Sequence, residues 1–172
     1  MNAILWPEGY TPGTTENFVS NEVIVAGLSA ADVWPLLSVP AQWPTYYANS
    51  ANVRFYEGRG PELALGDRFY FETFGFPVES QVTEFVPPSA AEAGRVAWHG
   101  WAGEDGADDR LDVIHAWLVE DLDGGRVRIL TQEVQKGAPA KALHEAKPNP
   151  MINGHQDWLD GLVAAAFASK QV

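Results

Sequence analysis

The sequence contains no cysteine among its 172 residues, which excludes disulfide bonds, thiolate catalysis and cysteine-based zinc sites. This absence fits a reducing compartment, and we expect a cytoplasmic protein. Long hydrophobic runs are also missing, since the longest, residues 162–168, is far short of the about 20 residues that cross a bilayer. Residues 1–18 lack the basic and apolar segments of a secretion signal, because Pro7, Glu8 and Pro12 interrupt them. We therefore expect neither a membrane span nor secretion.

Positive charge is scarce. Eleven Lys and Arg residues stand against 23 Asp and Glu residues, for a formal net charge of -12. Such a charge repels phosphate backbones and anionic membrane surfaces, and it also keeps a protein soluble. The sequence has no phosphate-binding glycine loop and no GxSxG motif. We therefore expect no nucleic-acid partner and no cofactor.

The apolar content is sufficient for one folded domain, because 46% of the residues are hydrophobic and only 20% are charged. Residues 1–16 contain Pro, Gly and aromatic residues without periodicity. They predict an arm that lies on the surface or against a neighbouring subunit, so a homodimer through this arm is possible. Residues 17–172 predict a single domain.

The order of secondary structure indicates an α+β protein. A strand at about 17–27 precedes a helix at about 30–38, which Ser29 caps, and a second short helix at about 40–48. Alternation of apolar and polar residues predicts six further strands. Short loops join them, including the tight turn 123–125, so neighbouring strands must pair antiparallel. These strands span about 51–57, 67–74, 77–86, 95–102, 111–121 and 126–136.

The last predicted element is a long amphipathic helix. Asn149 can cap it, and Pro150 suits its first position. An antiparallel sheet of about seven strands that curves around this helix is the architecture that the element order allows. The apolar stripe of the helix consists of Met151, Ile152, His155, Trp158, Leu159, Leu162, Val163, Ala166 and Phe167.

Several short motifs carry a family resemblance. Val33-Trp34 and Trp43-Pro44 follow the first strand within residues 23–47. This order resembles the start of the SRPBCC superfamily, which includes START domains, polyketide cyclase/dehydrase-like proteins, birch-pollen-allergen-type proteins and chaperone-ATPase-activator-like domains. The resemblance implies a helix-grip fold with an internal cavity over roughly residues 17–169, but no single reaction. Further matching segments lie at 65–71, 82–88, 96–100, 115–137 and 155–162.

A histidine and a glutamate are expected to share the interior. Alternation along neighbouring strands directs His115, Thr131 and Glu133 to the same face. A carboxylate among apolar side chains is costly to ionise, so Glu133 should either have a raised pKa or find a partner such as His115. Alternatively, Glu133 lies at the strand end and reaches water.

His155 is a second candidate acid or base. It shares the inward helix face with Leu159 and could work near neutral pH, or it could bond to a backbone carbonyl at a cavity rim. His99 and His144 are poor candidates. We expect no metal site, because the possible ligands do not converge in the sequence, and the acidic loop 104–109 lacks calcium-binding spacing.

Seven tryptophans are many for this length, and most should pack in the core while the rest line a pocket. We expect the protein to bind a small hydrophobic or aromatic molecule in an internal cavity. The alternatives are a polyketide cyclase- or dehydratase-like enzyme in which Glu133, His115 or His155 moves a proton, and a chaperone-activator-like interaction module. The candidate ligand-binding residues are Trp98, His115, Trp117, Thr131, Glu133, His155, Trp158, Leu159 and Leu162.

Overall fold

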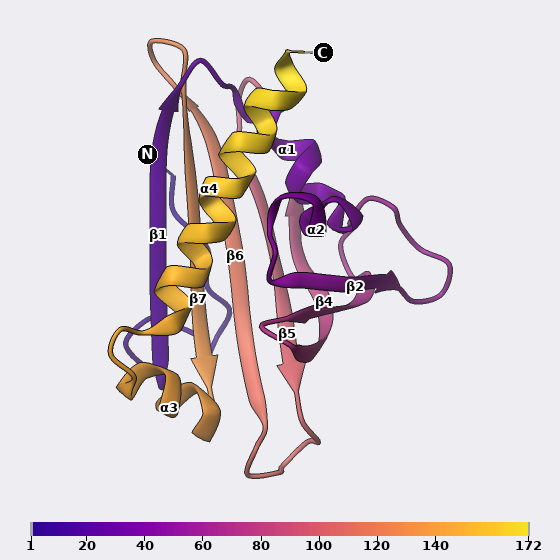
Figure 1. The fold of residues 1–172 in the computed structure, drawn as a ribbon, viewed down its shortest axis with the longest axis vertical. Helices are drawn as coiled ribbons and strands as arrows, with labels where there is room; N and C mark the ends of the chain where they lie inside the picture. The colour runs from indigo at the N-terminus through magenta and orange to yellow at the C-terminus, as the bar shows by residue number, and fades with distance from the viewer. Residues whose placement is uncertain (1, 172) are drawn as a thin grey trace.

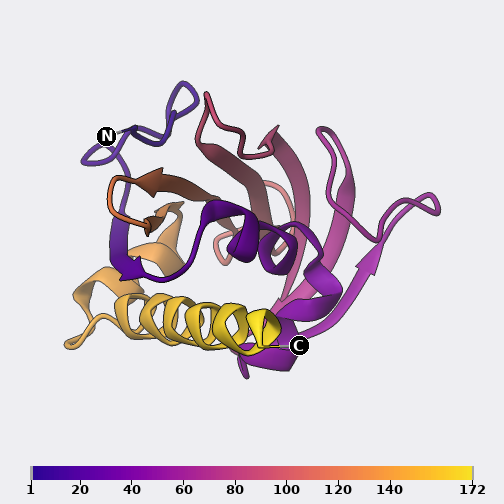
Figure 2. The ribbon, with the colours of Figure 1, turned by 90° about the horizontal axis from the view of Figure 1, so that it is seen from above.

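The computed structural model describes residues 2–171 as one strongly curved antiparallel sheet with a long helix lying across its concave face (Figures 1 and 2). The seven strands follow the order β1-β7-β6-β5-β4-β3-β2. The predicted α+β class and its seven strands are confirmed. The strands are β1 (Asn17–Ala26), β2 (Ser50–Phe55), β3 (Arg68–Thr73), β4 (Phe76–Val86), β5 (Gly94–Ala102), β6 (Leu111–Leu122) and β7 (Arg126–Lys136).

Short helices connect β1 to β2. Ser29 caps α1 (Ala30–Ser38) through a reciprocal pair of hydrogen bonds with Asp32. The second short helix, predicted at about 40–48, is present as a 3-10 turn, η1 (Pro40–Gln42), that leads into a single helical turn, α2 (Trp43–Tyr46). These elements lie at the open side of the curved sheet (Figure 2).

Two helices follow β7. The sequence did not predict α3 (Ala138–Glu145), which has only eight residues, is weakly hydrophobic and buries only Ala140. Helix α4 (Pro150–Lys170) begins as predicted, and the Asn149 side chain accepts a hydrogen bond from the Met151 amide at 3.0 Å. Within residues 2–171, none of the helices combines the length and the hydropathy that a membrane span requires.

Helix α4 packs onto the sheet along a narrow seam. Trp158, Leu159 and Leu162 are buried, as predicted. Ile152 and Phe167 were also expected in this seam, but they are 45% and 37% exposed. That part of the prediction is wrong, because the helix contacts the sheet over a narrower face than its apolar stripe covers. A side chain at Gly161 would collide with the backbone carbonyl of Tyr46, so α4 and α2 approach closely at this glycine.

The N-terminal arm lies on the convex face of the sheet within the same chain. Ile4 joins a second apolar cluster with Leu118 and Leu130. The backbone amide and side chain of Asn2 donate hydrogen bonds to the Glu120 carboxylate, which pairs with Arg128 at 2.8 Å. The arm covers both of these side chains, so Glu120 and Arg128 are buried although they lie on the convex face. A homodimer through this arm stays a prediction.

The seam leads to a stability prediction. Leu159 is fully buried, so Leu159→Ala should lower the free energy of unfolding by about 2–5 kcal/mol. Leu65→Ala is the matched control, because Leu65 is 67% exposed and its truncation should have little effect. Urea unfolding of both variants measures the difference. Equal midpoints for Leu159→Ala and the parent would show that α4 does not close the sheet.

Candidate functional site

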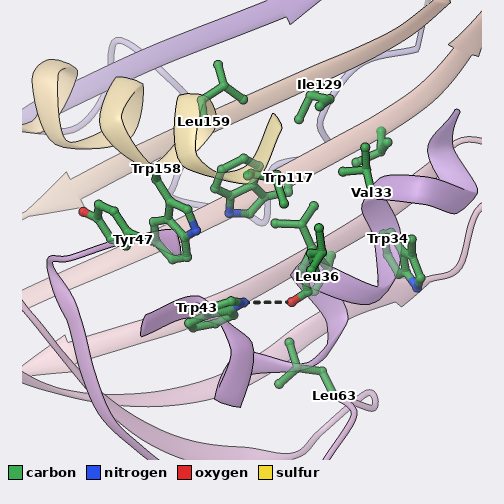
Figure 3. Packing of buried hydrophobic residues seen from close by; sticks show 14 of the residues in the cluster. Val33, Trp34, Leu36, Trp43, Tyr47, Leu63, Trp117, Ile129, Trp158 and Leu159 are labelled. Atoms are coloured by element: carbon green, nitrogen blue, oxygen red, sulfur yellow. Dashed lines mark hydrogen bonds between the residues drawn. The ribbon is translucent and has the colours of Figure 1, made fainter. Parts of the chain in front are cut away.

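Tryptophan rings pack together between the sheet and α4 (Figure 3). Trp43, Trp98, Trp117 and Trp158 are each at most 2% exposed. Trp43 stacks on Trp98 with ring centroids 5.3 Å apart, and its indole N-H donates to the Leu37 carbonyl at 3.0 Å. Trp158 meets Trp117 edge to face at 5.3 Å. This part of the interior is hydrophobic core, in which the four indole rings pack with aliphatic side chains such as Leu37 and Leu159.

Next to these rings, the interior contains a cavity of about 490 Å³. Its walls come from the concave face of the sheet, the first turns of α4, helix α3 and the β3–β4 hairpin. Asp109 and Glu133 are acidic members of this wall, and within residues 2–171 no Lys or Arg lines it. The aromatic residues of the wall are Tyr47, Phe71, Phe74, Phe76, Trp98, Trp101 and Trp158.

A buried glutamate and a histidine meet at the wall of this cavity. His115 on β6 lies directly opposite Glu133 on β7 in the antiparallel ladder. His115 Nδ1 is 3.0 Å from Glu133 Oε2, and its Nε2 is 2.9 Å from the Thr131 hydroxyl. The two residues are only 3% and 5% exposed. The structure therefore brings together the pair that strand alternation predicted.

A chain of amide side chains reaches the same carboxylate from the start of α4. The Gln135 side chain donates a hydrogen bond to Glu133 Oε1. The Asn17 side chain donates to Gln135 Oε1 at 2.6 Å, and the Asn149 side chain donates to Asn17 Oδ1 at 2.9 Å. Because Asn149 also caps α4, these bonds tie the first turn of the helix to the Glu133 carboxylate across β1 and β7.

The buried surroundings shift the pKa values of Glu133 and His115. Burial alone would raise the pKa of Glu133, but its interactions with His115 and His155 outweigh this effect and hold the pKa well below its usual range. Burial, followed by the nearby His155, lowers the pKa of His115 to about 4. Both shifts describe an ionised carboxylate beside a neutral imidazole at neutral pH. The alternative of a raised Glu133 pKa is therefore wrong.

His155 reaches the same carboxylate from the first turns of α4. Its Nε2 is 3.6 Å from Glu133 Oε2, and its ring lies nearly parallel to that of His115, with centroids 4.6 Å apart and 17° between the planes. Within residues 2–171 its Nδ1 has no hydrogen-bond partner, although it is buried. The expected bond to a backbone carbonyl is therefore not formed.

The structure separates the predicted ligand-binding residues into two groups. Trp98, His115, Glu133, His155 and Trp158 line the cavity. The other four are buried at 0–1% exposure in the core beside or behind that lining: Trp117, Thr131, Leu159 and Leu162.

Three further sequence expectations can be compared with the structure. Glu133 does not reach bulk water at a strand end, because it is 5% exposed. His99 lies away from the cavity and pairs with Asp112 at 2.8 Å. The argument against a metal site assumed that no ligands converge, and this premise is wrong: His115, Glu133 and His155 each place one possible ligand atom within 4.8 Å of the others.

Sequence reasoning missed part of the cavity wall. Phe74 and Phe76 flank the turn between β3 and β4, and both are exposed at the mouth. Gln135 follows Glu133 by two residues on the same strand, so alternation alone could have identified it. The contribution of α3 had no comparable signal, because that helix was not predicted.

The comparisons with known proteins agree with this architecture. No family model matches the sequence, and no curated protein does. The truncated norcoclaurine synthase of Thalictrum flavum has a similar structure, with a TM-score of 0.60, 14% identity, and coverage of 85% of this chain and 90% of that one. The di-domain ARO/CYC protein BexL, from the BE-7585A biosynthetic pathway, has a TM-score of 0.59 and 14% identity over 85% of this chain and 45% of its own. At these identities the likeness shows the fold alone.

The chain has a helix-grip fold, which is the architecture that the sequence resemblance implied. A much closer solved structure is that of hypothetical protein jhp0584 from Helicobacter pylori. It is 54% identical, covers 96% of this chain and 97% of that one, and has a TM-score of 0.92. The chain belongs to the same family as that protein.

The hydrogen bond behind His115 can be tested by a small substitution. Thr131→Val preserves the shape of the side chain but removes the hydroxyl that meets His115 Nε2. Leaving a buried polar atom without its partner should cost about 1–3 kcal/mol of unfolding free energy. Thr83→Val is the control, because Thr83 is an exposed threonine on β4. Urea unfolding that finds no loss for Thr131→Val would mean that this bond does not hold the ring.

Proposed function

We propose that the protein binds a small, mainly apolar molecule with an aromatic or otherwise planar part in the cavity beside α4. The observation that carries this proposal is a space of about 490 Å³ with a largely apolar wall, which includes seven aromatic residues and few polar groups. Cavities of about 300–1,000 Å³ with apolar walls and a few directing polar groups are typical of small-molecule sites. Each methylene group buried there would contribute about 0.8 kcal/mol.

The charges at the wall restrict the ligand further. Glu133 is held ionised, and Asp109 is the other acidic residue of the lining. Within residues 2–171 no Lys or Arg side chain lines the cavity to balance an anion. An anionic ligand would lose its hydration and meet like charge, which is unfavourable in a poorly solvated site. The preferred ligand is therefore neutral or cationic, with its polar end toward Glu133 and His155.

A pair of dyes tests both the cavity and its charge preference. N-phenylnaphthylamine is neutral, and anilinonaphthalene sulfonate adds a negative group to a similar aromatic frame. The neutral dye should bind with one molecule per chain and quench tryptophan fluorescence, because Trp98 and Trp158 line the cavity. The sulfonate should bind more weakly. Fluorescence titration measures both affinities.

A pair of matched variants on β4 tests whether the dye binds inside the cavity. Val78 lines the cavity, so Val78→Trp should fill part of it and weaken dye binding about tenfold or more, which corresponds to about 1.4 kcal/mol. Gln81→Trp adds the same ring at an exposed position on the same strand and should bind dye like the parent. Thermal unfolding checks that both variants are folded. Equal dye binding by both folded variants would place the dye outside the cavity and remove the support for this proposal.

A second candidate is a proton-transfer enzyme acting on a cavity-bound substrate. The observation that favours it is the buried Glu133 carboxylate, which opens onto the cavity beside two imidazoles. An ionised carboxylate within hydrogen-bonding distance of a substrate can accept a proton from it, and a neutral imidazole beside the carboxylate can pass that proton on. The names of norcoclaurine synthase and BexL agree with enzyme chemistry on this fold, although they describe those proteins only.

Substitution of the carboxylate separates the two candidates. Glu133→Gln keeps the size of the side chain but removes its charge and basicity. If the protein is an enzyme, turnover of the molecule that copurifies with it should fall about 100-fold or more, while its dissociation constant changes little. If the protein is a binder, mass spectrometry should find no conversion with either variant. Full turnover by Glu133→Gln would exclude the glutamate as the base.

A further inference from the structure

Three metal-ligand side chains converge where the cavity meets α4. His115 comes from β6, Glu133 from β7 and His155 from α4, and all three are buried and line the cavity. Their ligand atoms lie within 4.8 Å of one another. Three elements far apart in the sequence thus present two imidazoles and one carboxylate to a common point.

We propose that His115, Glu133 and His155 bind one divalent transition-metal ion of the zinc or iron(II) type at the cavity wall. Two imidazoles and one carboxylate form a ligand set that such ions accept, with further coordination positions left open. This site goes beyond the proposed ligand binding, because the cavity could hold an apolar molecule with or without the ion.

The spacing of the ligand atoms fits this ion. Zinc bonds of about 2.0–2.2 Å in tetrahedral geometry place two ligand atoms about 3.3 Å apart. Glu133 Oε2 is 3.0 Å from His115 Nδ1 and 3.6 Å from His155 Nε2, so the two separations bracket that value. The ligand atoms of all three residues lie within 4.8 Å of one another, so one ring has to move to close the site around an ion.

Outer hydrogen bonds already orient two of the three ligands. With Nδ1 on the ion, His115 Nε2-H would donate to the Thr131 hydroxyl, 2.9 Å away. Glu133 Oε1 accepts from Gln135, which Asn17 holds in turn. Outer partners of this kind fix the tautomer and the direction of ligand side chains in metal sites.

His155 is the ligand that has to move. Its ring is within 17° of parallel to the His115 ring, so it must turn for both nitrogen lone pairs to point at one ion. Within residues 2–171 the ring makes no hydrogen bond that would resist this rotation, and its Nδ1 is unpartnered. The fourth coordination position then faces the cavity, where water or a bound molecule can occupy it.

Direct titration of the full chain with metal alone tests the site. Protein stripped with a chelator should bind one Zn²⁺ per chain in calorimetry, and Co²⁺ should give the visible absorption of a nitrogen- and oxygen-ligated ion. His155→Ala and Glu133→Gln should each weaken Zn²⁺ binding about 100-fold or more, since loss of even an outer partner costs roughly 10–100-fold.

Two control variants test whether the other histidines contribute to Zn²⁺ binding. His144→Ala removes an exposed histidine on α3, and His99→Ala breaks the His99–Asp112 pair outside the cavity. Both should bind Zn²⁺ like the parent. Circular dichroism confirms folding, and if Glu133→Gln is unfolded, His155→Ala decides. The proposal is overturned if the parent binds no Zn²⁺ or if folded His155→Ala binds it unchanged. Binding of N-phenylnaphthylamine by the metal-free protein is an independent readout, so failure here leaves the ligand proposal intact.

Discussion

The closure of a strongly curved sheet by one helix is the constraint on which the rest of this structure depends. A sheet of this curvature has a concave face that its own side chains cannot fill, so α4 must cover it (Figure 2). Trp158, Leu159 and Leu162 form the buried seam of that contact. The Asn149 side chain fixes the start of α4 through its hydrogen bond to Asn17, and the close approach of α4 to α2 requires Gly161.

This closure leaves two different parts of the interior. Tryptophan rings pack against one another in one part, whereas α3 and the β3–β4 hairpin help to line a cavity in the other. Glu133 lies in the wall of the cavity, where an ionised carboxylate is costly. Replacing buried ionic groups by apolar side chains often preserves or increases stability. The contacts from His115 and Gln135 that keep this carboxylate in place are therefore better explained by binding or chemistry than by stability.

Much of the fold was predictable, because local patterns carry it. Strand alternation and glycine turns located the seven strands, and the same alternation directed His115 and Glu133 inward as neighbours across β6 and β7. Burial of Ile152 was predicted wrongly, because the width of a helix contact depends on the curvature of the sheet and not on the helix sequence.

The convergence at the site was harder to predict. His155 meets Glu133 only because α4 crosses the sheet at one angle and one height, and no spacing in the sequence encodes that crossing. The mouth residues Phe74 and Phe76 likewise depend on where the hairpin lies relative to α3 and α4. Covering of Glu120 by Asn2 joins segments 118 residues apart, which local patterns do not reveal.

A crystal structure of the protein purified without added ligand would test whether the cavity beside α4 is a ligand site. We expect an open cavity with connected electron density against its aromatic side chains, and a polar atom of the bound molecule near Glu133 or His155. A structure in which Phe74 and Trp158 turn inward and fill the space, so that no cavity exists between the sheet and α4, would contradict it.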